Sequence, residues 1–191
     1  MGSINHREVT MYYRIPYVIR VFFLITVIYL FTSSSMYGFE AHVNGVYFSS
    51  DGVAIKAVVK EIENATVEIL VRDNTFITPS IAQALITAQK RGATVEVILD
   101  TTTKPAPQSP AALLMKAKIP VYLDSAHRWV HNNIMIIDKT IVVTGSFNFH
   151  KSGLEKNNSN LLIIKSGTLA AHYTENWYKH REHALQLKGK L

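Results

Sequence analysis

The chain has 191 residues, no cysteine and a formal net charge of +6 at pH 7, and 48% of its residues are hydrophobic. This length and composition predict a globular chain with a sizeable core and exclude an intrinsically disordered protein. The lack of cysteine excludes disulfides, thiolate metal ligands and a cysteine nucleophile.

An apolar run, VFFLITVIYLF, occupies residues 21–31, with Arg14 and Arg20 before it and a run of serines after it. This arrangement is typical of a secretory signal, so we expect residues 1–41 to form an N-terminal signal peptide and the protein to be exported, to a periplasm or out of the cell. The alternative is a membrane anchor of about residues 15–39, which is long enough to span a bilayer. A buried core helix is the third interpretation, and Arg20 and the serines count against it.

Residues 42–191 form the predicted functional domain and carry 17 Lys+Arg against 12 Asp+Glu, which is a net charge of +5. A mildly basic domain suits a polyanionic partner such as nucleic acid or an anionic lipid surface. Many basic proteins bind neither, so charge alone does not choose the partner.

The first half of this domain alternates strands with helices. The expected strands are residues 43–49, 66–73, 94–100 and 120–124, and the expected helices between them are residues 53–65, 79–91 and 110–118. Thr78 and Ser109 are candidate N-caps because each precedes a proline at the first helical position. Gly92 is the expected terminator of the second helix.

The second half changes pattern. Residues 133–138 and 141–146 are separated by only Lys139 and Thr140, which predicts a tight hairpin, and residues 161–165 predict another buried strand. The closing helix is expected at about residues 168–187. Its core-facing residues are expected to be Leu169, Tyr173, Trp177 and Ala184. The pattern as a whole predicts an α/β fold with a mixed, largely parallel sheet flanked by helices on both faces.

The candidate chemistry centres on His131. A lone histidine before a strand is more often structural than catalytic, but the returning hairpin strand adds Gly145, Ser146 and Asn148. Hydroxyl, amide and backbone donors of this kind bind phosphate oxygens. Glu155 follows shortly afterwards. A carboxylate, an imidazole and several neutral donors form a set suited to phosphoryl transfer.

The stretch VHNNIMIIDKTIVVTGSFNF, residues 130–149, resembles the motif of phospholipase D-like phosphodiesterases, His-x-Lys-x4-Asp followed by Gly-Ser-x-Asn-Phe. The residues in register are His131, Asp138, Gly145, Ser146, Asn148 and Phe149. The resemblance covers about residues 43–183 and is strongest to bacterial members with a single motif, both endonucleases and phospholipases D. It implies the phospholipase D-like fold and metal-independent cleavage of a phosphodiester through a phosphohistidine, with no cofactor and no metal.

The resemblance also implies roles for individual residues. His131 would be the nucleophile or the general acid, and Glu155 would orient its imidazole. Ser146 and Asn148 would hold the nonbridging phosphate oxygens, and Asn133 would lie in the same phosphate-binding position as the motif lysine.

Three further residues have supporting roles in this interpretation. Asp138 and Gly145 are expected to be structural members of the motif, with Asp138 pairing with nearby backbone or basic groups. His127 is expected at the site wall, and a direct contact with the substrate is its alternative role. Because the mechanism uses two histidines and the chain has one motif, the resemblance implies a two-fold homodimer in which the two copies of His131 share one site.

Asn133 is the one departure from the motif, because the family places a lysine there. Removing one well-placed donor from a site of this kind costs about 10²- to 10³-fold in rate, and loss of a cation matters more. Three explanations remain open. Turnover is impaired, another basic group such as Arg128 or Lys151 substitutes, or the protein binds phosphodiesters without cleaving them.

These observations leave three functional hypotheses. A nonspecific endonuclease is favoured, with nucleic acid held through its phosphates. A phospholipase D that acts on membrane phospholipid head groups shares the same chemistry. A noncatalytic phosphodiester-binding module is the third hypothesis, and Asn133 is its main support.

Overall fold

The structure is a computed structural model that describes residues 40–48, 52–73, 77–99, 106–124, 132–149 and 159–187. All of these residues belong to one compact unit, residues 39–191. The predicted signal peptide or anchor lies outside the described residues, apart from its last two positions. Within the described ranges, no helix is both long enough and apolar enough to cross a membrane.

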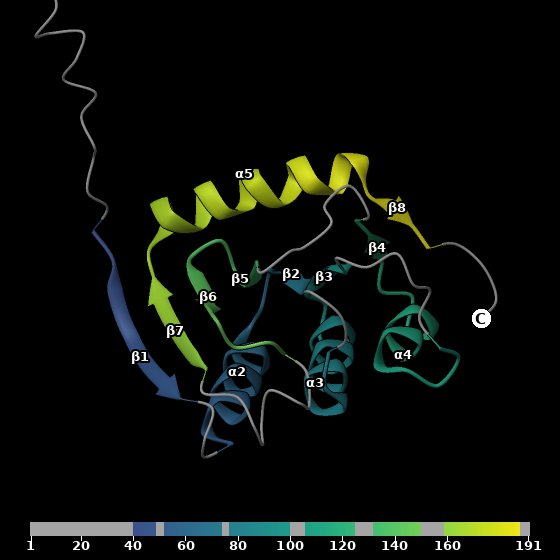
Figure 1. Cartoon of the computed structure of the whole chain (residues 1–191), viewed down its shortest axis with the longest axis horizontal. Coiled ribbons are helices and arrows are strands. Elements are labelled where there is room, and N and C mark those ends of the chain that lie inside the picture. The colour runs from purple at the N-terminus through teal and green to yellow at the C-terminus, as the bar shows by residue number, and fades with distance from the viewer. Residues whose placement is uncertain are drawn as a thin grey trace, which may run out of the picture. The chain divides into compact units, whose positions relative to one another are not determined.

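The described part of the chain contains one eight-stranded sheet with the order β1-β7-β6-β5-β2-β3-β4-β8 (Figure 1). The strands are β1 (His42–Phe48), β2 (Glu68–Asp73), β3 (Thr94–Leu99), β4 (Val121–Leu123), β5 (Asn133–Ile137), β6 (Ile141–Gly145), β7 (Asn160–Lys165) and β8 (Leu185–Gln186). Every residue of β5 is buried, as are the last five residues of β2. The centre of the sheet therefore has helices or side chains against both of its faces.

The sheet is mixed, as predicted, but the expectation that parallel pairings would dominate was wrong. The pairings of β2 with β3 and of β3 with β4 are parallel, as two successive strand–helix–strand units require. The other five pairings between described strands are antiparallel. The hairpin of β5 and β6 lies beside β2 in the antiparallel direction, and β7 and β1 continue the antiparallel order on that side.

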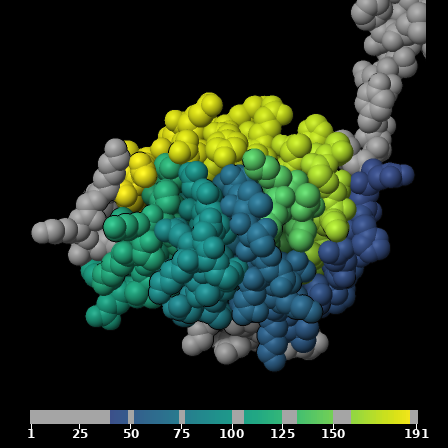
Figure 2. Space-filling view, turned by 180° about the vertical axis from the view of Figure 1, so that it is seen from behind, coloured from purple at the N-terminus to yellow at the C-terminus, as the bar shows by residue number. Residues whose placement is uncertain are grey.

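Helices cover both faces of the sheet, as predicted. On one face α2 (Val53–Asn64), α3 (Pro79–Lys90) and α4 (Pro110–Lys116) lie side by side. Figure 2 shows the molecule from behind, with these segments in blue to green. On the other face α5 (Gly167–His183) runs across the strands (Figure 1). The larger apolar core lies under the three helices and the smaller core lies under α5. Burial of these two cores supplies most of the driving force for the fold.

The predicted N-caps of α3 and α4 and the predicted terminator of α3 are confirmed, whereas α4 ends at Lys116, two residues earlier than expected. The hydroxyl of Thr78 accepts a hydrogen bond from the Ile81 amide at 3.4 Å, and Ser109 caps α4 in the same way. Gly92 follows α3 with φ 107°, and the bonds from Gly92 and Ala93 back to the last turn complete a Schellman motif. The helix boundaries therefore follow from local chemistry.

The predicted hairpin of β5 and β6 is confirmed, with Ile137 paired to Ile141, but β5 ends one residue earlier than expected and Asp138 lies in the turn with Lys139 and Thr140. The Thr140 amide donates to the Ile137 carbonyl at 3.1 Å, and Asp138 and Lys139 have φ values of 50° and 57°. Positive φ at both central residues defines a type I′ turn, whose twist matches that of the flanking strands.

The closing helix is confirmed, and its predicted core residues pack against the smaller core, with Trp177 fully buried. Its expected end at about residue 187 was wrong. The helix ends at His183, Ala184 is extended, and residues 185–186 pair with β4 as a short antiparallel strand. This pairing satisfies the backbone groups at the open edge of β4.

The strand ends that carry the motif lie together along one side of the sheet, at the carboxyl ends of the parallel strands. β2, β3 and β4 end there, and the antiparallel strands β5 and β7 begin there. We name it the motif edge and define it by Asp73, Asp124, Asn133, Gly145 and Asn160.

Candidate functional site

The segment after β6 is held in place by two buried aromatic side chains. Phe147 and Phe149 are 1% and 0% exposed and pack edge to face, with ring centroids 6.3 Å apart. The Thr78 amide donates to the Phe149 carbonyl at 2.6 Å, which ties the segment to the start of α3. Side chains alternate along an extended chain. Ser146 and Asn148 therefore project away from this core, and they are exposed and half-buried respectively.

Gly145 allows β6 and β7 to approach closely at the motif edge. A Cβ at this position would lie 2.2 Å from the carbonyl oxygen of Asn160, and the residue has φ 152°. Next to it, the Ser146 hydroxyl accepts a hydrogen bond from the Asn160 amide at 3.1 Å. Glycine is required here because any side chain would push the two strands apart.

Asn133 and Asn148 are joined directly. The side-chain amide of Asn133 donates to the side-chain oxygen of Asn148 at 2.5 Å. Asn133 is 4% exposed, and its own Oδ1 is buried with no hydrogen-bond partner among the residues that the structure describes. The bond fixes the orientation of the Asn148 amide, whose Nδ2 then points away from Asn133. The position of the motif lysine is therefore occupied by a neutral group that binds another motif residue.

Asp138 lies in the β5–β6 turn, at the opposite end of β5 from Asn133. Its carboxylate accepts hydrogen bonds from the backbone amides of Thr66, Val67 and Glu68 at 2.8 to 3.2 Å. Burial raises the pKa of this carboxyl, but the three backbone donors and the Thr66 hydroxyl outweigh burial and lower it below its ordinary value. The carboxylate fastens the hairpin to the start of β2 and is remote from the motif edge.

Several sequence-predicted site residues lie outside the described residues. His131, Glu155 and His127 are among them, as are Arg128 and Lys151, which were candidates to replace the motif lysine. Asp124 and Asn133, which lie on either side of the segment that carries His131, are both at the motif edge. The described motif residues that share this edge are therefore Asn133, Gly145, Ser146 and Asn148.

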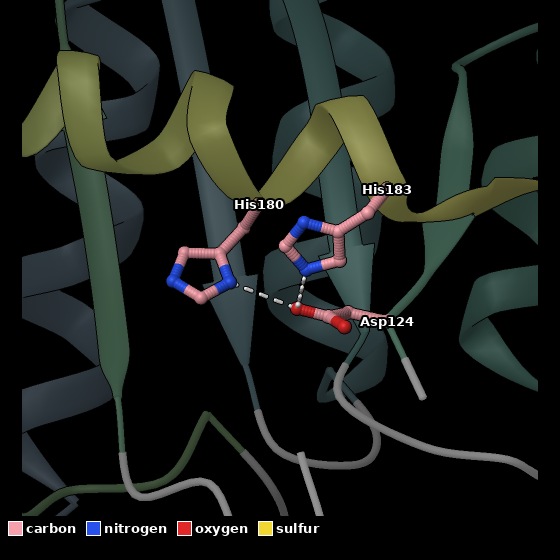
Figure 3. A group of neighbouring side chains, drawn as sticks. All are labelled: Asp124, His180 and His183. Atoms are coloured by element: carbon pink, nitrogen blue, oxygen red, sulfur yellow. Dashed lines mark hydrogen bonds and ion pairs between the residues drawn. The ribbon is translucent and has the colours of Figure 1, made fainter. Parts of the chain in front are cut away.

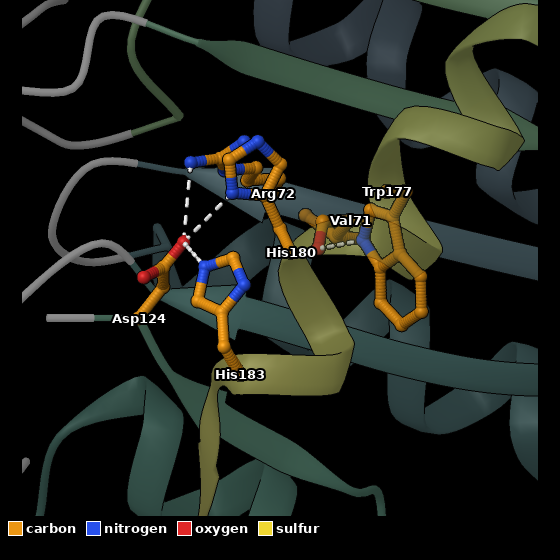
Figure 4. Close-up of polar contacts among 6 residues, drawn as sticks. All are labelled: Val71, Arg72, Asp124, Trp177, His180 and His183. Carbon is orange, nitrogen blue, oxygen red and sulfur yellow. Dashed lines mark hydrogen bonds and ion pairs between the residues drawn. The ribbon is translucent and has the colours of Figure 1, made fainter. Parts of the chain in front are cut away.

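A second polar cluster was not predicted from the sequence (Figures 3 and 4). The Asp124 Oδ2 atom lies 2.9 Å from His180 Nδ1, 3.3 Å from His183 Nε2 and 3.4 Å from the guanidinium of Arg72. Asp124 and Arg72 are 1% and 2% exposed. Two sequence signals point to the cluster: charged residues at the ends of the apolar strands β2 and β4, and two histidines three residues apart on one helix.

Three comparisons with known proteins agree on the family. A family model described as the PLD-like domain of cardiolipin synthase matches residues 58–181. A phospholipase D of Rickettsia prowazekii is 35% identical over 134 residues, which cover 70% of this chain and 65% of that protein. A mitochondrial cardiolipin hydrolase of Xenopus laevis is 31% identical over 103 residues, which cover 54% of this chain and 49% of that protein.

Among solved structures, Nuc from Salmonella typhimurium, a phospholipase D family member, superposes with a TM-score of 0.71 at 29% identity. The match covers 78% of this chain and 100% of Nuc. The fold is thus the phospholipase D-like fold, and the chain belongs to the phospholipase D-like superfamily. The chain spans 65% of the length of the Rickettsia phospholipase D that it matches.

Proposed function

We propose that the chain is a phosphodiesterase whose site lies at the motif edge, and that nonspecific cleavage of nucleic acid is its main activity. The observation that supports this most is the Asn133–Asn148 bond beside Ser146, which presents an amide and a hydroxyl on the edge where the His131 segment begins and ends. Neutral donors fixed in advance are suited to nonbridging phosphate oxygens. The net charge of +6 favours a polyanionic substrate.

In the proposed reaction a nitrogen of His131 attacks phosphorus and the P–O bond to the leaving group breaks. A second histidine gives its proton to the leaving oxygen. Water then attacks the phosphohistidine, the second histidine takes a proton from that water, and His131 is released with a phosphate monoester as product. We propose that the second histidine is His131 of another copy of the chain in a two-fold dimer, and that Glu155 orients the imidazole.

Asn133 limits the rate in this proposal. An uncharged amide cannot neutralise the phosphate, and this one is already bonded to Asn148. Phosphoryl transfer depends on electrostatic stabilisation of charge in the transition state. We therefore propose that substrate binding is retained and that turnover is lower than in a chain with lysine at this position.

The second candidate function is hydrolysis of phospholipid head groups. It is favoured by the names of two relatives, a phospholipase D and a mitochondrial cardiolipin hydrolase. An apolar N-terminal segment that stayed attached would place the site near a membrane, whereas a cleaved signal would release an exported enzyme. The third candidate, a binding module without turnover, rests on Asn133.

One paired assay separates the three candidates. Plasmid DNA and vesicles of phosphatidylcholine with cardiolipin are incubated with the full chain in the presence of a chelator. His131→Ala is the inactive variant, and His172→Ala, an exposed histidine on α5, is its matched control. We expect nicking of DNA that persists in chelator, is lost in His131→Ala and is kept in His172→Ala.

Other outcomes of the assay would favour one of the other candidate functions. Lipid cleavage without DNA cleavage would replace the endonuclease proposal with the phospholipase. Salt-sensitive DNA binding with no cleavage of either substrate would favour the binding module. Cleavage unaffected by His131→Ala would contradict the proposed chemistry itself.

A further inference from the structure

The cluster of Asp124, His180 and His183 lies on the opposite face of the sheet from the described motif residue Asn133. Along β2, Val71 packs in the larger core and Leu70 in the smaller core, so Arg72 shares the α5 face with Leu70. Asp124 lies on the same face, because it contacts Arg72 and the histidines of α5. Asn133 precedes Ile134, which belongs to the α5 side, and so Asn133 faces the other side of the sheet. The cluster and the Asn133–Asn148 pair thus share an edge but not a face.

The three side chains offer metal-ligand atoms to one point. One ring nitrogen of His180, one ring nitrogen of His183 and a carboxylate oxygen of Asp124 all lie within 4.8 Å of one another. Zinc bonds to nitrogen and carboxylate oxygen of about 2.0–2.2 Å place tetrahedral ligand atoms about 3.4 Å apart. The Asp124 oxygen is 2.9 Å from one histidine nitrogen and 3.3 Å from the other, so a small outward movement of the imidazoles makes room for the ion.

Helix α5 holds His180 and His183 in position without a bound ion. His180 and His183 are one turn apart on the same face of α5, and both side chains point toward Asp124 (Figure 3). Trp177, one turn earlier, is fully buried and its indole donates to the Val71 carbonyl at 2.9 Å, which locks the helix over β2 (Figure 4). The side chain of His183 is 42% exposed and gives an ion a route from solvent, while that of Asp124 is fully buried.

Arg72 would influence the affinity of a metal site here, because it contacts the carboxylate. Its guanidinium is 3.4 Å from the same Asp124 oxygen, farther than the nearest nitrogen of His180 or His183. A positive neighbour weakens cation binding, but a guanidinium bonded to a ligating carboxylate also holds that carboxylate in place. Two imidazoles and one carboxylate suit zinc and related transition ions and are poor ligands for magnesium or calcium.

We propose that Asp124, His180 and His183 form a zinc site that fastens the last turn of α5 to β4, with water as the fourth ligand. Each imidazole would bind the ion as a neutral ligand through the ring nitrogen that faces Asp124, so its remaining proton would lie on the other ring nitrogen and any second proton would pass to water. Zinc in this position stabilises the closing helix and takes no part in phosphodiester chemistry.

The test uses the purified full chain after removal of metals with a chelator and exchange into clean buffer. Zinc bound per chain, the visible bands of tetrahedral Co²⁺ and the melting temperature are measured for the wild type, His183→Gln and His172→Gln. His183 is partly exposed, so its replacement leaves the cores intact, and His172 is a matched histidine on the same helix outside the cluster.

Zinc at about 100 times its Kd is expected to raise the melting temperature of the wild type and of His172→Gln by about 5–10 °C. His183→Gln is expected to lose the shift, the cobalt bands and one bound zinc per chain, and Mg²⁺ is expected to shift none of the three. Equal zinc binding by wild type and His183→Gln, or no zinc-dependent shift in the wild type, would overturn the proposal. No substrate is present, so this result is independent of the proposed phosphodiesterase activity.

Discussion

The side-chain amide of Asn133 donates a hydrogen bond to the side-chain oxygen of Asn148, and so joins the first residue of β5 to the segment after β6. The bond determines which end of the Asn148 amide faces away from β5. That end is the Nδ2 donor, which suits a phosphate oxygen. Asn133, which replaces the charged lysine of the motif, therefore also orients the side chain of Asn148.

Asn148→Asp tests this orientation. The carboxylate keeps an acceptor for Asn133 but replaces the outward donor with negative charge, so the fold is expected to hold and phosphate binding to weaken. We expect DNA affinity at moderate salt to fall about tenfold or more, with a melting temperature close to that of the wild type. Fluorescence anisotropy with labelled DNA measures the first quantity and circular dichroism the second. Unchanged affinity would remove Asn148 from the site.

Asp138→Asn is expected to lower the free energy of unfolding at pH 7 by about 1–3 kcal/mol, because the carboxylate accepts bonds from three backbone amides. The pKa of this carboxyl is lowered in the folded chain. Its contribution is therefore complete above the unfolded pKa of about 3.9 and is lost as the pH falls through the lower folded pKa.

Urea denaturation of wild type and Asp138→Asn at several pH values measures this effect. The difference between the two chains should be constant near neutrality and shrink below about pH 4. Glu63→Gln, at an exposed carboxylate on α2, is the control and should show little difference at any pH. A difference that grew toward low pH would contradict the assignment.

Gly145→Ala is expected to destabilise the fold by about 1–3 kcal/mol, because the new Cβ would lie 2.2 Å from the Asn160 carbonyl oxygen. Gly167→Ala, at the first residue of α5, is the matched substitution, since a Cβ there meets nothing within 4 Å. It should be neutral or stabilise by about 0.5 kcal/mol. Thermal unfolding of both variants measures the contrast, and equal melting temperatures would argue against the close approach of β6 and β7.

Lys118→Gly is expected to stabilise the chain by about 0.5–1 kcal/mol. Lys118 follows α4 at a φ of 64°, in a Schellman motif completed by the bond from the Ile119 amide to the Leu114 carbonyl at 3.0 Å. Gly92 has the same place after α3, and Gly92→Ala should destabilise by about 1 kcal/mol. Denaturant titration of both variants tests the pair, and a loss of stability in Lys118→Gly would show that its side chain has an unassigned contact.

Local chemistry explains which features could be predicted from the sequence. Thr78, Ser109 and Gly92 act on residues within one turn of themselves, and the tight hairpin joins two strands that are neighbours in the chain. Each of these features was predictable because its partner lies nearby in the chain. The motif spacing likewise led to the superfamily, since it preserves the order of His131, Asp138 and the Gly145–Phe149 segment.

Long-range arrangement could not be predicted in the same way. The antiparallel placement of β5 beside β2 depends on which face and direction the hairpin adopts, and both directions bury the same apolar residues. The contact of Asp124 with His180 joins residues 56 apart, and helical spacing alone gave no reason to connect them. The Asn133–Asn148 bond has the same character, because the hairpin register decides it.

The role of position 133 in turnover is tested by the rate of plasmid cleavage by the wild type and by Asn133→Lys, measured side by side with His131→Ala in each background. Lysine is expected to raise the rate about 10²-fold or more by restoring charge at the phosphate, and His131→Ala is expected to abolish cleavage in both chains. Equal and high rates with asparagine and lysine would show that position 133 has no electrostatic role in turnover.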